Sequence, residues 1–162
     1  RRCDVKVRNS IPFRLGTSSK SHFKRAKILW TGVLAAVLMI VVNMLLNVIY
    51  SKVFPGITEM YSSMDVFRSM GDPLMMLFFI YPLVLGIGLA WIWSYTKGIF
   101  KKDSTFWAGL KFGWAYFVIA GIPIFFINVG SFDLPIMMIG TWVDMLAANG
   151  LIAGWVFAKW AR

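Results

Sequence analysis

Polar side chains are sparse within the long apolar stretches of this sequence, and they are the groups there that could do chemistry. They include Asn43, Asn47, Tyr81, Tyr116 and Asp144. A charged Asp at the centre of a lipid bilayer costs about 2.5–3.5 kcal/mol on insertion scales, so Asp144 is expected to face protein or water. We predict that these side chains meet near the middle of the membrane and bind a proton, a cation or a small polar solute.

A purely structural role for Asp144 is the alternative. Its carboxyl group would then hydrogen-bond to Asn43 or to a tyrosine and fix the register of neighbouring helices. Interhelical hydrogen bonds of this kind average only about 0.6 kcal/mol in membrane proteins, yet they specify geometry. The sequence leaves both roles open.

Catalysis is the least supported class of function. The one histidine, His22, and the one cysteine, Cys3, both precede the first apolar stretch. General acid–base chemistry usually needs two positioned groups, and the apolar stretches offer one carboxylate and no histidine. Zinc and haem sites commonly use His or Cys ligands. We therefore expect no catalytic residue, no metal site and no cofactor.

Four long apolar segments must position these side chains. They cover approximately residues 28–50, 74–94, 106–128 and 134–158, and 59% of the chain is hydrophobic. Each has the roughly 20 residues that a helix rising 1.5 Å per residue needs to cross about 30 Å of hydrocarbon. The predicted fold class is all-α, an integral membrane four-helix bundle over residues 28–162. Residues 1–27 are predicted to form a disordered basic tail, with an organellar transit peptide as the alternative.

The connections between these segments differ in length and pattern. Residues 51–73 form a long loop in which apolar side chains recur every three or four residues, which predicts a short amphipathic helix on the membrane surface. These side chains are Ile57, Met60, Tyr61, Met64 and Phe67. Asp72 with Pro73, residues 103–105, and Pro135 are expected to cap and start the segments that follow them.

Prolines and small residues favour opposite halves of the predicted bundle. Pro82 and Pro123 lie in the outer half, where we expect them to kink their helices and open the bundle outward. Small residues gather in the inner half and should let helix backbones approach closely. They are Gly32, Ala36, Gly86, Ala90, Gly109, Gly113, Gly150 and Gly154. Association with helices of another protein is the competing use of these small-residue surfaces.

The two halves of the chain share a pattern that predicts two tandem helical hairpins. The first and third segments both open with a Trp followed two residues later by Gly, at Trp30 and Trp107. The second and fourth segments both close with Gly, three residues, a small residue and Trp, ending at Trp91 and Trp155. Parallel repeats of this kind are related by a pseudo-two-fold axis along the membrane normal.

Basic residues lie almost entirely at one end of the predicted helices. Of the 17 Lys and Arg residues, only Lys52 and Arg68 fall at the other end. Because Lys and Arg concentrate in cytoplasmic loops, both termini are predicted to be cytoplasmic. The net charge of +10 is then explained by anionic lipid headgroups near the tail rather than by nucleic acid. Most tryptophans, including Trp93, fall near the same boundary and are expected to be interfacial anchors.

Two stretches of the chain resemble small four-helix bacterial membrane proteins of uncharacterised families. They are Gly109-Leu-Lys-Phe-Gly113-Trp114 and Asn149-Gly-Leu-Ile-Ala-Gly154-Trp155. The resemblance implies a multi-pass fold in a bacterial inner membrane, and it implies no activity.

Two functions remain open at this level. The first is a non-catalytic accessory, assembly or scaffold subunit that contacts other membrane helices in a homo-oligomer or a larger complex. The second is a small transporter or channel-like protein that moves a proton, a cation or a small polar solute through the cluster around Asp144.

Overall fold

The computed structural model is helical throughout most of the part of the chain that it describes, residues 18–63, 68 and 71–161. Its helices are α1 (Ser18–Val53), α2 (Pro55–Ser63), η1 (Pro73–Met76), α3 (Leu77–Thr96), α4 (Thr105–Tyr116), η2 (Phe117–Gly121), α5 (Ile122–Ser131) and α6 (Ile136–Trp160). Four helical runs are long and apolar enough to cross a membrane, namely Ala26–Val53, Pro73–Thr96, Thr105–Ser131 and Ile136–Trp160. The predicted all-α class with four spans is confirmed, and the chain is a multi-pass membrane protein.

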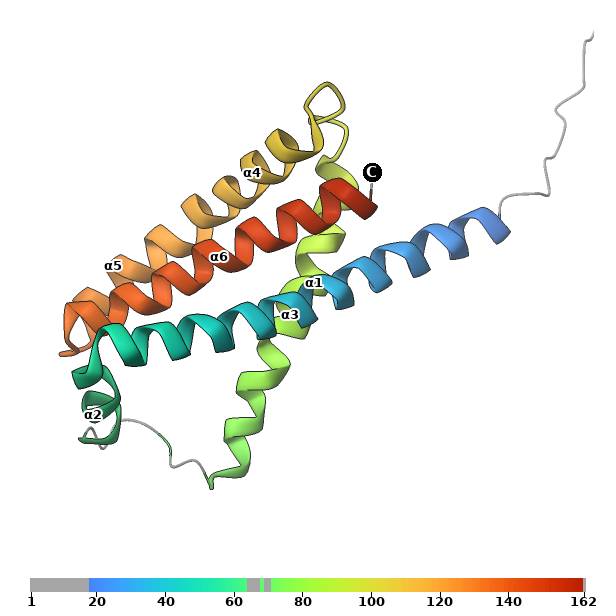
Figure 1. The fold of residues 1–162 in the computed structure, drawn as a ribbon. Coiled ribbons are helices and arrows are strands. Elements are labelled where there is room, and N and C mark those ends of the chain that lie inside the picture. The colour runs from blue at the N-terminus through green and yellow to red at the C-terminus, as the bar shows by residue number, and fades with distance from the viewer. Residues whose placement is uncertain (1–17, 64–67, 69–70, 162) are drawn as a thin grey trace, which may run out of the picture.

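The four spans pack as two helical hairpins of different shape (Figure 1). α4 and α5 run beside α6, whereas α3 crosses α1 and lies apart from it on the side where α3 begins. α1 also packs on α6 and so joins the two hairpins. The bundle is therefore tight around the α1–α3 crossing and spread out between α1 and the first half of α3.

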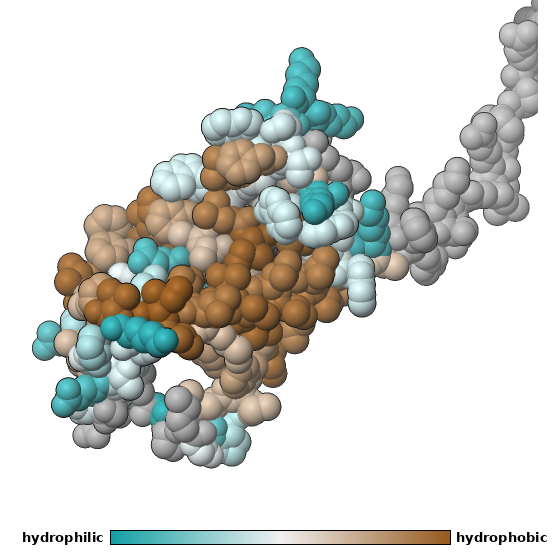
Figure 2. Space-filling model, in the orientation of Figure 1, coloured by the Kyte–Doolittle hydropathy of each residue, from teal (hydrophilic) through white to brown (hydrophobic). Residues whose placement is uncertain are grey.

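Apolar side chains cover the outside of the spans as well as their inside. Leu45, Val84, Ile119 and Phe126 are all exposed by more than half of their surface. Figure 2 shows hydrophobic surface across the middle of the molecule and hydrophilic side chains toward its ends. Hydrocarbon is the solvent that suits such a surface.

Small residues set the distance between the helices of each hairpin. A Cβ atom added at Gly86 would lie 2.5 Å from the carbonyl oxygen of Gly32, and one added at Gly113 would lie 2.7 Å from that of Gly150. Backbones this close gain dispersion contacts over a wide area, which lipid tails cannot match. The eight small residues singled out in the sequence are all buried at these two crossings.

The two hairpins cross at corresponding residues of the proposed repeat. The matched contacts are Ala36–Gly86 with Gly113–Gly150, and Gly32–Ala90 with Gly109–Gly154. This agreement supports two tandem hairpins built on one pattern. The halves then differ beyond the crossings, because only the first hairpin spreads apart.

An aromatic cluster fills the end of the bundle where α3 ends and α4 begins. Trp93 is only 1% exposed, and its ring stacks on Phe100 with centroids 5.5 Å apart. Phe112 packs edge-to-face against the Trp93 ring, and the tilted ring of Phe157 completes the contact. The expectation that Trp93 is an interfacial anchor is therefore wrong, because its ring is needed to fill the space between α3, α4 and α6.

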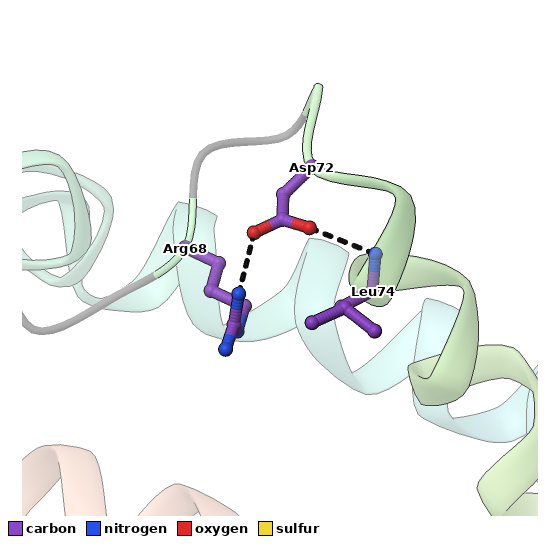
Figure 3. A network of polar contacts seen from close by, with 3 residues as sticks. All are labelled: Arg68, Asp72 and Leu74. Atoms are coloured by element: carbon purple, nitrogen blue, oxygen red, sulfur yellow. Dashed lines mark hydrogen bonds and ion pairs between the residues drawn. The ribbon is translucent and has the colours of Figure 1, made fainter.

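The predicted helix starts are confirmed by capping contacts. Asp72 accepts a hydrogen bond from the backbone N–H of Leu74 at 2.8 Å and one from the Arg68 guanidinium at 2.7 Å (Figure 3). Ser104 accepts one from the backbone N–H of Trp107 at 3.3 Å, and Pro135 directly precedes α6. The Arg68 hydrogen bond, followed by that of Leu74, holds the pKa of Asp72 below its ordinary value.

The third span changes its winding ahead of Pro123. η2 is a π-helical turn in which the N–H of Ile122 donates to the carbonyl of Phe117, five residues back. Single π turns relieve a local defect in an α-helix, and proline is such a defect because it lacks an N–H. The disturbance expected at Pro123 is thus a π-helical turn, with Gly121 buried against the Phe117 ring.

Candidate functional site

A cavity of about 280 Å³ lies between α1, α3 and α6, where α3 diverges from α1. α1 contributes Asn43 and Asn47, α3 contributes Tyr81, and α6 contributes Trp142 and Asn149. The remaining lining residues are apolar. Most of the cavity wall is therefore hydrophobic, with polar groups at a few points, as in many small-molecule sites.

Two amide oxygens at this cavity are buried and unpaired. Oδ1 of Asn43 and Oδ1 of Asn149 have no hydrogen-bond partner among the described residues. Asn149 is only 1% exposed. A buried acceptor without a donor costs about 1–3 kcal/mol, and hydrocarbon supplies no water to replace the donor. Neither oxygen has accessible surface in this conformation, so a donor in the cavity would reach them only if the amide groups turned toward it.

The depth of the polar groups follows from their places in the spans. Asn149 lies at the middle of Ile136–Trp160, while Asn43 and Tyr81 lie about 5 Å from the middle of their spans at 1.5 Å per residue. The polar part of the cavity is therefore set deep in the hydrocarbon rather than at a headgroup interface.

The chemistry of the lining favours a neutral occupant. None of the cavity-lining residues, all of which belong to the described part of the chain, is Asp, Glu, Lys or Arg. An ion without a compensating charge is far more costly to bury than a neutral polar group. The lining thus suits a neutral molecule better than a bare cation or proton.

The structure brings three of the predicted site residues together. Asn43, Asn47 and Tyr81 all line the cavity. Tyr116 lies behind them, with its ring against Gly150 and its side chain interacting with Tyr81. Tyr116 can therefore position Tyr81 without lining the cavity itself.

Asp144 does not join this cluster. It is exposed, and it accepts a hydrogen bond of 3.3 Å from the hydroxyl of Tyr50 on α1. Five residues separate Asp144 from Asn149, which places their side chains about 140° apart around α6 at 3.6 residues per turn. The predicted meeting of Asp144 with the asparagines is therefore corrected, because α6 turns Asp144 to a different face.

Asn149 and Trp142 are the lining residues with polar groups that the sequence prediction missed. Trp142, Met145 and Asn149 recur at spacings of three and four residues, which places them on one face of α6. That spacing was the available signal. The indole N–H of Trp142 donates to the hydroxyl of Tyr61 at 2.5 Å, so α2 is tied to α6 beside the cavity.

The amphipathic helix expected in the long loop is α2. Its Ile57 is buried, and Tyr61 reaches Trp142 as described. Met64 and Phe67, the other end of the predicted stripe, lie outside the described residues. α2 thus covers the end of α1 near the cavity rather than lying free on the surface.

Among the described residues, no group of three or more His, Cys, Asp or Glu side chains is placed to hold a metal ion.

No family model matches the sequence, and neither a curated protein nor a solved structure is significantly similar to it.

Proposed function

We propose that this protein is a non-catalytic membrane protein that binds a small neutral solute in the cavity between α1, α3 and α6. The observation that carries the proposal is the lining of this cavity, a mostly apolar wall to which Asn43, Asn47 and Asn149 contribute deep in the membrane. The unpaired Oδ1 atoms of Asn43 and Asn149 have no accessible surface, so an occupant would reach them only after the amides turned.

The cavity limits the size and character of the solute. Its volume of about 280 Å³ is near the lower end of ligand pockets and well above the 150 Å³ or so that accommodates benzene in an engineered cavity. The apolar wall requires an apolar body, and the polar side chains of the lining favour a molecule that also carries a hydrogen-bonding group. A small neutral molecule with a hydroxyl or amide group meets these requirements, and its carriage through the membrane is the activity that such a site would serve.

A set of monosubstituted benzenes tests this proposal. They share one ring and differ in their head: benzyl alcohol donates a hydrogen bond, benzylammonium and benzoate carry opposite charges, and toluene has no polar head. Binding to the folded state raises the unfolding temperature. Benzyl alcohol should raise it more in the wild type than in the variant Asn43→Leu with Asn149→Leu, and the other three should show no such difference. An equal response of both proteins to benzyl alcohol would refute the proposed site.

The proposal also covers the membrane in which the protein lies and the orientation of the chain in it. In the cell inner membrane, both termini would lie in the cytoplasm, because Lys and Arg gather before α1, between α3 and α4 and at the end of α6 and concentrate on the cytoplasmic side of membrane proteins. The cavity would then open toward the outer leaflet. Cys3, the single cysteine, should react with a membrane-impermeant maleimide only after the cells are permeabilised, and labelling in intact cells would reverse the orientation.

An accessory role in a membrane complex is the second candidate function. The observation that favours it is Asp144, an acid that lies exposed on a membrane-spanning helix. An exposed acid at this depth is costly in lipid and is relieved by a partner. If the protein migrated as a monomer after gentle extraction from its native membrane, this second function would be ruled out.

A further inference from the structure

Asp144 and Tyr50 form a polar pair on the outside of the bundle. Asp144 is the only Asp or Glu within the four spans, and it lies about 12 Å along α6 from Ile136 at 1.5 Å per residue. Its observed partner is the neutral hydroxyl of Tyr50, at 3.3 Å. The ion pairs found among the described residues join Arg68 to Asp72 and Lys111 to Asp103, so the carboxylate of Asp144 has no cationic partner there.

The face of α6 around Asp144 has room for another helix. Gly140, Ala147 and Ala148 lie four residues before, three after and four after Asp144, and these spacings place them on the same side of the helix. A Cβ atom added at Gly140 would have no neighbouring atom within 4 Å. Small side chains beside a polar group are typical of surfaces where membrane helices approach closely.

We infer that this face docks a membrane-spanning helix of another protein that carries a Lys or Arg at the depth of Asp144. The inference rests on the accessory role proposed above and names its partner by charge. A basic side chain would pair with the carboxylate, and the Tyr50 hydroxyl would hold the carboxylate in place. Opposite charges that pair inside hydrocarbon remove the cost that each would bear alone.

A second copy of this chain fits the face less well. A two-fold contact centred here would bring two Asp144 carboxylates together, and like charges at close range repel. The chain also offers few basic groups at this end of the spans. Lys52 lies in the last turn of α1, and Arg68 is already bound to Asp72.

Synthetic membrane-spanning peptides provide the test. The full chain is reconstituted in lipid bilayers with a donor dye on Cys3, and it is titrated with acceptor-labelled leucine–alanine helices. These helices carry Lys, Glu or Leu at the depth of Asp144, and energy transfer reports their association. The Lys helix should bind about tenfold more tightly than the Leu helix, and the Glu helix should not exceed the Leu helix.

Variants of this chain test whether the preference for the Lys helix depends on the face of α6 around Asp144. Asp144→Asn should abolish the preference for the Lys helix. Gly140→Leu should weaken binding of the Lys helix by filling the open space beside Gly140. Asp133→Asn, which removes an exposed acid just before α6, should leave the preference unchanged. Equal binding of the Lys and Leu helices, or a preference that survives Asp144→Asn, would overturn the inference. Self-association that depends on Asp144 in the absence of peptide would overturn it in favour of a second copy.

Native electrophoresis of membrane extracts separates this inference from the accessory role. A complex that contains the wild type and is lost with Asp144→Asn supports both. A complex that persists with Asp144→Asn leaves the accessory role standing and refutes docking at Asp144. If the wild type is a monomer, the accessory role is refuted. The inference of a native partner with a basic helix is then refuted too, even if the Lys helix binds.

Discussion

At the scale of single residues, Asn149 sets the chemistry of the site. Its amide is buried at the cavity wall with an unpaired oxygen, while other buried polar groups of α6 are satisfied locally. Thr141, for example, donates its hydroxyl hydrogen to the carbonyl of Met138 at 2.7 Å. Asn149 therefore has a cost that packing alone does not offset, and an occupant of the cavity would remove it only if the amide turned toward it.

Replacement of Asn149 by Leu, which has a similar size, should stabilise the empty protein. The change removes an unpaired buried acceptor, so the free energy of unfolding should rise by about 1–3 kcal/mol. Thr141→Val is the matched control, because it removes a paired hydroxyl and should not stabilise the protein. Unfolding in mixed micelles measures both variants. A loss of stability in Asn149→Leu comparable to that of a core truncation would mean that the amide is already paired.

Asp72 gives a pH-dependent prediction outside the membrane. Its pKa is lowered by the hydrogen bond from Arg68 and then by that from Leu74. Because the pKa of Asp72 is lower in the folded state, its carboxylate contributes stability at neutral pH. This contribution is lost as the pH falls through the folded-state pKa, which lies below the ordinary value of 3.8. The ¹³C shift of the Asp72 carboxyl should titrate below 3.8 in the wild type and at a higher pH in Arg68→Ala. An identical midpoint in both proteins would show that Arg68 does not bind it in solution.

At the scale of helices, each hairpin is held together by a crossing at small residues, of α1 with α3 and of α4 with α6. The cavity lies where the contact between α1 and α3 ends. Gly154 packs on the backbone of Gly109, whereas Gly140 on the same helix faces open space. The same residue type thus has a packing role at one position of α6 and none at the other.

Gly154→Ala and Gly140→Ala should have opposite effects on stability. The Cβ at position 154 meets the Gly109 backbone and should cost about 1–3 kcal/mol through overpacking. The Cβ at position 140 meets nothing, and Ala is more favourable than Gly in a helix by about 1 kcal/mol. Thermal unfolding of the two variants checks the difference. Equal effects would mean that α4 and α6 do not cross at Gly154.

The sequence predicted the elements well and the site only in part, for a physical reason. Length and hydropathy determine which segments span the membrane, and a spacing of four residues puts Asn43 and Asn47 on one face of α1. Which face of α6 meets them depends on how α6 is rotated, and the small residues at Gly150 and Gly154 fix that rotation by packing on α4. This rotation brings Asn149 to the cavity and leaves Asp144 outside. The burial of Trp93 also depends on tertiary packing, which a preference for membrane interfaces does not report.

At the scale of the whole molecule, the bundle combines a packed end with a spread end. Aromatic and small residues fill the end near Trp93 and Gly154, and the divergence of α3 from α1 creates the cavity farther along. Polar side chains at a few points of a mostly apolar wall suit the small neutral solute that we propose.

The most direct test of solute binding is the intact mass of the protein released from native-lipid discs. The wild type should carry a bound small molecule, because the cavity combines a mostly apolar wall with three asparagine side chains. The Asn43→Leu with Asn149→Leu variant should appear at its bare mass, and Thr141→Val should retain the adduct. A wild type found only at its bare mass, or the same adduct on the wild type and the double variant, would contradict solute binding between α1, α3 and α6.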